Sequence, residues 1–190
     1  TYFDENSFPD SRWGLGIDRL RAHYAFLLER VLCHADFGLV LKPKTPRALR
    51  ARLGPVGEVL DLAVATGRCH IFEDGIVQGA IAPAQAAWVA DIAIHSSVAS
   101  GTAGVEAALA GVPTVLIDDD GWTISPLYRL EKNRVIFDDW ETLWHTWRDH
   151  RLQPNCVPGF GAWSALLDEL DPFRDGRAAE RMGTYLKWLI

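Results

Sequence analysis

The pattern of hydrophobic residues predicts short apolar strands that alternate with amphipathic helices. Between residues 17 and 34, leucine, tyrosine and valine recur at spacings of three and four, which predicts a helix with one buried face. Short apolar runs that end at turn formers or charged residues are typical of strands. Five such runs lie at 36–42, 69–72, 91–96, 112–118 and 134–137.

These five runs are apolar throughout and do not alternate with polar residues, so both faces of their sheet should be covered. Helices are expected between them, at 47–52, 56–65, 83–90 and 101–110, and again in the tail. The alternation predicts an α/β fold: a Rossmann-like parallel sheet of about five strands with helices on both faces, followed by C-terminal helices.

Residues 1–15 contain turn formers and no clear period, and they are predicted to be a loop or a linker. We therefore expect a linker and leading helix over 1–35 and the Rossmann-like domain over 36–150. Residues 151–190 are expected to be a helical extension of the same domain.

The composition narrows the class of protein. Of 190 residues, 48% are hydrophobic and 23% charged, which is typical of a globular chain. The net charge of −6 and the lack of a basic cluster argue against nucleic acid as a partner. Cys33, Cys69 and Cys156 have neither metal-ligand spacing nor a disulfide pattern, which favours thiols in a reducing compartment. There is no apolar run of ~20 residues and no secretory signal, so a cytoplasmic protein is expected.

Small and polar residues separate a predicted strand from a predicted helix in the segment SVASGTAG, residues 97–104. Ligands of parallel sheets bind beyond the carboxyl ends of the strands. With Ser100 as the helix cap, the N–H groups of Gly101, Thr102 and Ala103 would face a phosphate or diphosphate. The alternative is that Ser100 only caps the helix, and that small residues let the helix pack close to the sheet.

Charged residues near this segment favour the ligand interpretation. Glu106 is the only Asp, Glu, Lys or Arg between Asp91 and Asp118, and its carboxylate could accept hydrogen bonds from the two hydroxyls of a ribose. Lys42 and Lys44 follow the first predicted strand, where positive charge could hold a diphosphate. The alternative for all three side chains is simple exposure to solvent.

The stretch ADIAIHSSVASGTAGVEAALAGVPTVLID, residues 90–118, resembles the donor-binding segment of GT-B fold glycosyltransferases. Related segments occur in bacterial enzymes of envelope and surface polysaccharides, such as the lipid-A-disaccharide synthases and the MurG peptidoglycan glycosyltransferases. In this family, the C-terminal half binds the nucleotide sugar. The resemblance implies that Ser100, Gly101 and Thr102 contact the diphosphate and that Glu106 contacts the ribose.

The resemblance also suggests contacts for the nucleobase and the sugar. Ala80 and Ile81 would contact the base through backbone atoms, which favours uracil and hence UDP. Asp118 would contact the transferred sugar, and His95 is a candidate for phosphate or sugar, with a histidine packed beside the sheet as the alternative. Trp122, in the loop after 112–118, is a further candidate for a sugar or acceptor contact.

Two other groups of residues are interpreted as structural and not as ligand-binding. Trp140, Trp144 and Trp147 share one helical face, and such a stripe is more often core than a sugar-binding surface. The acidic residues 118–120 could suggest a metal site, but GT-B enzymes generally need none, and a solvated acidic loop is preferred. No metal and no cofactor are expected beyond the donor substrate.

Together these features predict the nucleotide-sugar-binding half of a glycosyltransferase that acts on a cell-surface polysaccharide or glycolipid acceptor. The chain begins at Thr1 and its single methionine is Met182, so we expect it to be part of a longer protein. A missing N-terminal domain would supply the catalytic base of an inverting reaction, and no catalytic residue is assigned here. The arginines near the C-terminus are also candidates for contact with an anionic membrane surface. Two alternatives remain, a UDP-sugar 2-epimerase-like enzyme and a non-catalytic nucleotide-binding or regulatory domain.

Overall fold

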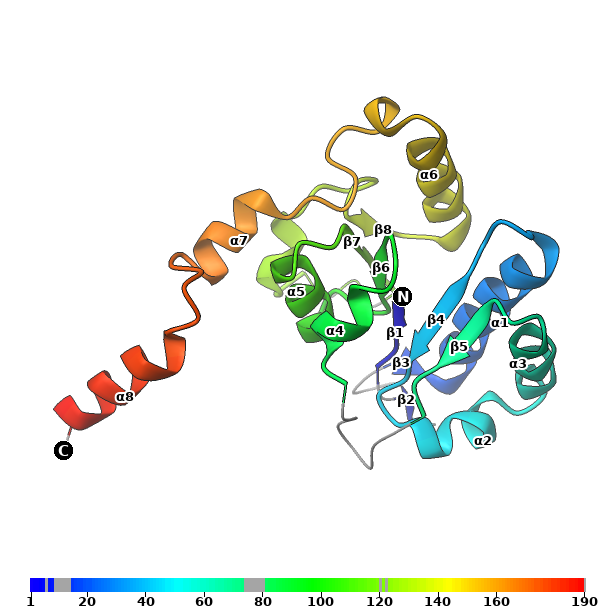
Figure 1. Cartoon of the computed structure of the whole chain (residues 1–190), viewed down its shortest axis with the longest axis horizontal. Coiled ribbons are helices and arrows are strands. Elements are labelled where there is room, and N and C mark those ends of the chain that lie inside the picture. Colours follow the sequence, from blue (N-terminus) through cyan, green and yellow to red (C-terminus); the bar gives the residue numbers. More distant parts are fainter. Residues whose placement is uncertain (6, 9–14, 74–80, 120, 122, 190) are drawn as a thin grey trace.

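The computed structural model describes residues 1–5, 7–8, 15–73, 81–119, 121 and 123–189. Six strands form one all-parallel sheet with helices on both sides (Figure 1). They are β1 (Tyr2–Phe3), β4 (Leu39–Lys42), β5 (Cys69–Ile71), β6 (Ala93–His95), β7 (Thr114–Ile117) and β8 (Ile136–Phe137). A second, two-stranded sheet pairs β2 (Ser7–Phe8) with β3 (Leu15–Gly16).

The helices follow the strands in the order that the sequence predicts. They are α1 (Ile17–Cys33), α2 (Leu49–Leu53), α3 (Val56–Ala65), α4 (Pro83–Ala87), α5 (Thr102–Leu109), α6 (Trp140–Leu152), α7 (Ser164–Leu170) and α8 (Ala178–Trp188). Short 3₁₀ turns cover Pro46–Ala48, Pro126–Arg129 and Pro154–Cys156. The predicted α/β fold with a parallel sheet and C-terminal helices is confirmed.

The sixth strand, β1, lies at the centre of the sheet, where the sequence predicted a loop. Tyr2 is in register with Leu41 of β4 on one side and Ile94 of β6 on the other. The prediction of a loop or a linker over 1–15 is therefore wrong at Tyr2 and Phe3, and it is also wrong at Ser7–Phe8 and at Leu15, which form the small second sheet. A strand of two residues is too short to produce a hydrophobic period, so the pattern could not reveal it.

The order of strands across the sheet is β5-β4-β1-β6-β7-β8. The chain runs outward from β1 to β5, returns to β6 beside β1, and then runs outward again to β8. The direction of winding therefore reverses between β1 and β6. In Rossmann-like sheets, ligands bind at such a topological switch point, beyond the carboxyl ends of the strands.

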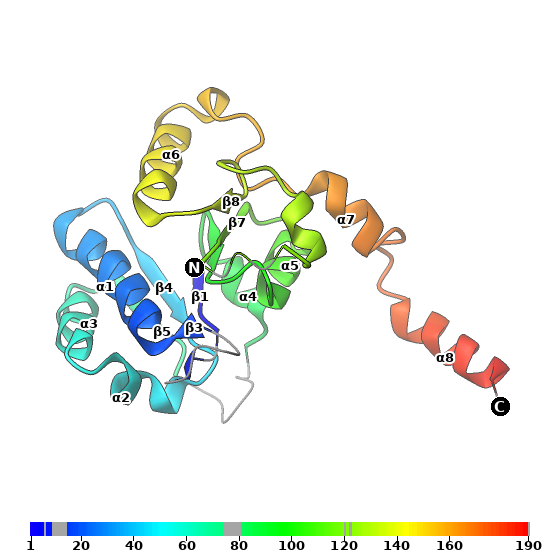
Figure 2. The same ribbon diagram turned by 180° about the vertical axis from the view of Figure 1, so that it is seen from behind.

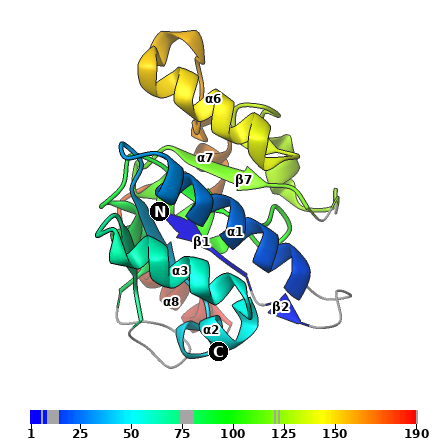
Figure 3. The same cartoon turned by 90° about the vertical axis from the view of Figure 1, so that its right-hand side faces the viewer.

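Alternate side chains of the strands supply two different cores. Tyr2 belongs to the core cluster that it shares with residues of α1, α3 and α6, and these helices lie along one face of the sheet (Figure 3). Phe3 points to the opposite face and packs with Ala86 of α4 and Ala107 of α5. Both aromatic side chains of β1 are buried, at 0% and 2% exposure. The first strand therefore joins the two layers.

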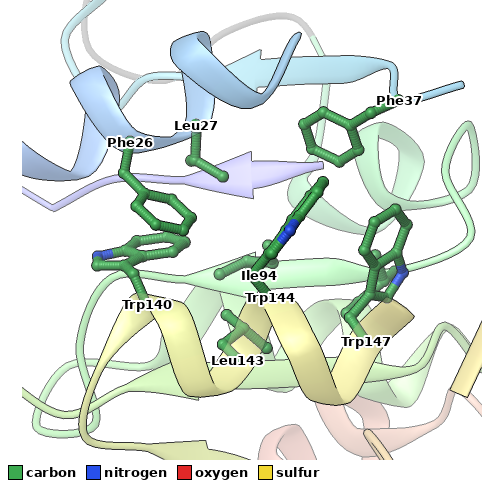
Figure 4. A pocket seen from close by; sticks show the side chains of 9 residues that line it. Phe26, Leu27, Phe37, Ile94, Trp140, Leu143, Trp144 and Trp147 are labelled. Atoms are coloured by element: carbon green, nitrogen blue, oxygen red, sulfur yellow. The ribbon is translucent and has the colours of Figure 1, made fainter. Parts of the chain in front are cut away.

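The tryptophan stripe of α6 belongs to the core, as predicted. Trp144 is buried, and Trp140 and Trp147 pack against the same cluster. Figure 4 shows these rings turned toward Phe26 of α1 and toward Phe37. The apolar cavity that they line measures about 20 Å³, little more than one water molecule needs, so it offers no space for a sugar.

The two C-terminal helices differ in how they attach to the domain. Leu166 and Leu167 of α7 are buried in a cluster with Trp163, whose Nε1 donates to the Thr114 carbonyl at 2.8 Å. No residue of α8 is buried, and the helix extends away from the sheet (Figure 2). Within the described residues, no helix has both the length and the apolar character that crossing a bilayer requires.

We expect a chain that lacks residues 174–190 to melt within about 2 °C of the full chain, because none of the described residues in 174–189 is buried. A chain that lacks 163–190 also loses Trp163, Leu166 and Leu167, and its Tm should fall by about 10 °C. Thermal melts of the three chains test this, and equal losses in both truncations would contradict it.

Candidate functional site

Polar residues gather where the strands on either side of the switch point end. Asp4 and Glu5 follow β1, Lys44 lies two residues beyond β4, and His95 is the last residue of β6. We call Glu5, Lys44, His95 and Ser97 the switch-point cluster, because contacts connect them in this place. The members come from three segments that are far apart in the sequence, and the strand order brings them together.

Glu5 is the centre of the switch-point cluster. Its Oε2 accepts a hydrogen bond from Lys44 Nζ at 2.5 Å, and its Oε1 lies 3.3 Å from His95 Nε2. Burial raises the pKa of Glu5, but the contacts with His95 and Lys44 outweigh this and bring the pKa below its usual value. The carboxylate is therefore ionised at neutral pH, and 13% of the side chain remains exposed.

His95 lies behind Glu5 with no exposed surface. Its Nδ1 is 3.0 Å from the Ser97 carbonyl oxygen and 3.2 Å from the Ser97 nitrogen. One ring nitrogen thus faces the Ser97 backbone and the other faces Glu5. The position fits the alternative of a histidine packed beside the sheet, and a ligand would meet Glu5 before it met His95.

The turn before α5 differs from the prediction. The helix is capped by Gly101 and not by Ser100, and no side chain completes the cap. The Ser97 hydroxyl instead accepts from the backbone N–H groups of Ala99 and Ser100, at 3.1 and 3.3 Å. A serine that bonds two and three residues ahead makes a turn of its own, and the sequence pattern did not distinguish this turn from a helix cap.

The N–H groups at the start of α5 also differ from the prediction. Thr102 N–H donates to the Ser100 carbonyl at 2.7 Å, so it does not face a ligand as predicted. The helical ladder begins with Val105 N–H, which donates to the Gly101 carbonyl at 2.9 Å. The N–H groups of Ala103 and Gly104 precede the ladder and find no partner in the part of the chain that the structure describes.

Packing gives a sufficient reason for both glycines of the turn. A Cβ atom at Gly101 would lie 2.7 Å from the Leu127 side chain, and one at Gly104 would lie 3.1 Å from Leu116. Larger residues would push α5 away from the sheet. The small residues therefore serve close packing, whether or not the turn also holds a diphosphate.

Lys42 and Glu106 lie on the same side of the sheet. Lys42 and His95 are both in register with Phe3, so these three side chains point to the face that α5 covers. Burial raises the pKa of the half-buried Glu106, and the positive charge of Lys42 partly opposes this shift. The fold thus places two predicted ligand residues within electrostatic reach of each other.

The remaining predicted residues have separate environments. Ile81 is half-buried and packs against the same small cluster as Ala103, at the start of α5. Asp118 accepts hydrogen bonds from Tyr128 Oη at 2.6 Å and Gly121 N–H at 3.0 Å, which hold its own loop. Ala80 and Trp122 were also predicted to contact the ligand, and they lie outside the described residues.

The sequence interpretation missed the carboxylates that follow β1. Asp4 is buried and accepts from Tyr24 Oη at 2.9 Å and from Lys44 N–H at 2.5 Å. A buried aromatic pair followed at once by two acids is the signal that could have revealed them.

A second buried chain of contacts runs from Tyr2 Oη to His23 Nδ1 at 3.0 Å, and His23 Nε2 pairs with Asp119.

A larger cavity, among the residues that the structure describes, lies elsewhere. It measures about 350 Å³ and is lined by residues that precede β4 and β6, among them Gly38 and Asp91. It is thus at the amino ends of the strands, opposite the switch-point cluster. Because ligands of parallel sheets bind at the carboxyl ends, we place the candidate site at the switch point and not in this cavity.

Comparison of the chain with protein-family models, with curated proteins and with solved structures gave no match. Among the described residues, no group of three or more His, Cys, Asp or Glu side chains could hold a metal ion. The interpretation of the site therefore depends on its own geometry.

Asp4→Asn should change how stability depends on pH. Burial raises the pKa of Asp4 from 3.8 to about 6, and the bonds from Lys44 and Tyr24 oppose this only in part. A raised folded-state pKa stabilises the protein below pH 3.8, and this contribution is lost as the pH rises through about 6. Asp4→Asn should remove this loss, which is about 3 kcal/mol.

Urea unfolding of both proteins at pH 4 and pH 7 measures this difference. Asp36→Asn is the matched control: the Arg151 guanidinium lowers the pKa of the exposed Asp36, so its pH effect should have the opposite sign. An unchanged pH dependence in Asp4→Asn would contradict the prediction.

Proposed function

We propose that this chain binds a nucleoside diphosphate sugar, with UDP as the nucleotide, and forms the donor-binding half of a glycosyltransferase. The observation that carries the proposal is the convergence at the switch point. There, the start of α5, Lys42, Lys44 and Glu106 lie at or near the carboxyl edge of a Rossmann-like sheet.

The start of α5 is the proposed diphosphate site. The N–H groups of Ala103 and Gly104, together with the helix dipole, favour an anion there. Lys42 and Lys44 add positive charge from the end of β4. Departure of UDP in glycosyl transfer increases the negative charge on the diphosphate, so these groups would stabilise the transition state more than the bound donor.

Glu106 is the proposed ribose ligand. It lies three residues after Ala103, so the two positions are neighbours on the helix surface, one turn apart. A nucleotide whose diphosphate is at the helix start could thus present its ribose to the Glu106 carboxylate. The backbone near Ile81, whose side chain packs against the same cluster as Ala103, would then contact the uracil.

The acceptor and the catalytic base would come from a second domain. The acceptor class that we propose is a cell-surface glycan or glycolipid, and the reaction would take place on the cytoplasmic side of the membrane. The exposed apolar residues of α8, such as Tyr185 and Leu186, would be available for that domain or for the membrane surface. By itself the chain should bind nucleotide with little or no turnover.

A second candidate is a nucleotide-binding regulatory domain without catalysis. It is favoured by the finding that packing against Leu127 and Leu116 is a sufficient reason for Gly101 and Gly104. Both candidates bind nucleotide, and they differ in whether the nucleotide-linked sugar is transferred by the full-length protein.

Thermal shifts with UDP, GDP, CDP and ADP test the proposal. A ligand at ten times its Kd stabilises the fold by about 1.4 kcal/mol, which should raise the Tm by roughly 3 to 6 °C. We expect UDP to give this rise in the wild type. Glu106→Gln should weaken UDP binding by about tenfold, because a carboxylate accepts stronger hydrogen bonds than an amide.

Glu58→Gln is the control for Glu106→Gln, since Glu58 is an exposed carboxylate of α3 outside the site. It should bind UDP as the wild type does. If none of the four nucleotides stabilises the wild type, or if Glu106→Gln binds UDP unchanged, the proposal is wrong.

A further inference from the structure

Residues 42–52, which we call the basic segment, concentrate positive charge in a chain whose net charge is −6. The segment contains five Lys or Arg residues and no Asp or Glu. It begins at the end of β4 and continues through the 3₁₀ turn Pro46–Ala48 into α2, so it lies at the carboxyl edge of the sheet. Leu49 and Leu53 of α2 are buried in the core and fix the segment at this edge.

Pairs within the chain neutralise only part of this charge. Lys44 pairs with Glu5 and Arg50 pairs with Asp61, and both basic side chains remain roughly half exposed. Exposed pairs of this kind are weak, so an external anion can replace the carboxylate. Arg47 is exposed and has no partner among the described residues. The basic segment therefore retains capacity for an anionic partner.

Helix α8 presents an exposed apolar face, and none of its described residues is buried. Met182, Tyr185 and Leu189 recur at spacings of three and four, with Leu186 and Trp188 beside them. Tyr185 and Trp188 are 71% and 89% exposed. Polar residues occupy the opposite face of the helix: Glu180, Thr184 and Lys187. The helix is thus amphipathic, with its apolar face in water.

The basic segment and α8 lie at the same end of the molecule. In all three views, which differ by turns about the vertical axis, α2 and α8 lie toward the lower side (Figure 1, Figure 2 and Figure 3). The loop that follows β7 adds the exposed Ile124 at the carboxyl edge. One extended surface on that side can therefore contact both elements. In that contact α8 supplies apolar area more than charge, because Arg177 and Arg181 pair with Glu180 and Asp175.

The combination of positive charge and apolar area fits one kind of partner. A nucleic acid would pair with the basic segment but would leave the apolar face of α8 in water. A second copy of the chain could cover α8 but would give Arg47 no counter-charge. The interface of an anionic bilayer offers phosphates to arginine and an apolar layer to tyrosine, tryptophan and leucine side chains.

We propose that the carboxyl edge of the sheet docks onto an anionic membrane surface, with the basic segment at the lipid phosphates and the apolar face of α8 in the interface. This inference goes beyond the proposed function, because it needs no bound nucleotide. A glycolipid acceptor in the same membrane would then lie at the edge of the sheet where we propose that the donor binds.

Sedimentation of the whole chain with lipid vesicles tests the inference in the absence of nucleotide. One set of vesicles contains phosphatidylcholine alone, and the other also contains the anionic phosphatidylglycerol. We expect the wild type to bind the anionic vesicles about tenfold or more tightly than the neutral ones, because each arginine near an anionic surface strengthens binding about fivefold. High salt should remove most of this preference, since it screens the charges.

Arg47→Gln/Arg50→Gln should bind anionic vesicles about tenfold more weakly and neutral vesicles as the wild type does. Both side chains are exposed and lie outside the proposed nucleotide contacts, so the fold should be retained. Arg148→Gln/Arg151→Gln is the matched control, because it removes the same charge near the end of α6, where Arg151 lines the cavity at the amino edge. The control should bind both kinds of vesicle as the wild type does.

Leu186→Gln tests the apolar face of α8. It should weaken binding to both kinds of vesicle about tenfold, because it removes an apolar side chain from the interface, and the loss should persist in high salt. Leu186 is exposed, so the fold should be retained. Leu152→Gln is the matched control, since Leu152 is an exposed leucine at the end of α6, and it should bind as the wild type does.

The inference is overturned if the wild type has no preference for anionic vesicles, or if either control loses as much binding as its partner variant. Light scattering without vesicles checks the other occupant of α8: a dimer that Leu186→Gln dissociates would assign the helix to a second copy and overturn the proposal. A chain that binds UDP but no vesicles contradicts this inference alone. A chain that binds vesicles but no nucleotide contradicts only the proposed function.

Discussion

Strand β1 holds the two halves of the sheet together, and the rest of the structure depends on that contact. Its two residues pair with β4 on one side and β6 on the other. The Ile94 and Ser96 N–H groups donate to the carbonyls of Thr1 and Phe3, at 2.8 and 3.1 Å. Tyr2 and Phe3 point to opposite faces, so one dipeptide also joins both helical layers.

The central position of β1 determines the electrostatics of the candidate site. Two carboxylates, Asp4 and Glu5, lie at the middle of the carboxyl edge of the sheet. Different groups stabilise the negative charge of each one. Asp4 is buried and accepts from Tyr24 and from the Lys44 backbone, and burial prevails, so its pKa is raised. The negative charge of Glu5 is stabilised by the side chains of His95 and Lys44, and its pKa is lowered. Adjacent carboxyls with pKa values shifted apart are typical of functional sites, although buried structural networks also produce them.

The α5 turn shows how packing and binding can require the same residues. Gly101 and Gly104 bring the helix close to Leu127 and Leu116, and the N–H groups of Ala103 and Gly104 at its start have no partner among the described residues. The glycines alone therefore do not distinguish a ligand site from a packing site. The proposed function therefore relies on the charges nearby, since packing does not require Lys42 and Glu106 to lie within electrostatic reach of each other.

The sequence by itself determined the class of fold and the order of its elements, because helices such as α1 and apolar runs such as β7 have periods or lengths that can be recognised locally. It also indicated Lys42, Glu106 and the small-residue turn as neighbours of one sheet edge, since the ends of parallel strands share that edge. Tertiary structure decided the rest. A strand of two residues is defined by hydrogen bonds from its neighbours, and so are the positions of Asp4 and Glu5 after it. The contacts of Glu5 with Lys44 and His95 join residues 39 and 90 positions apart, and only the strand order brings them together.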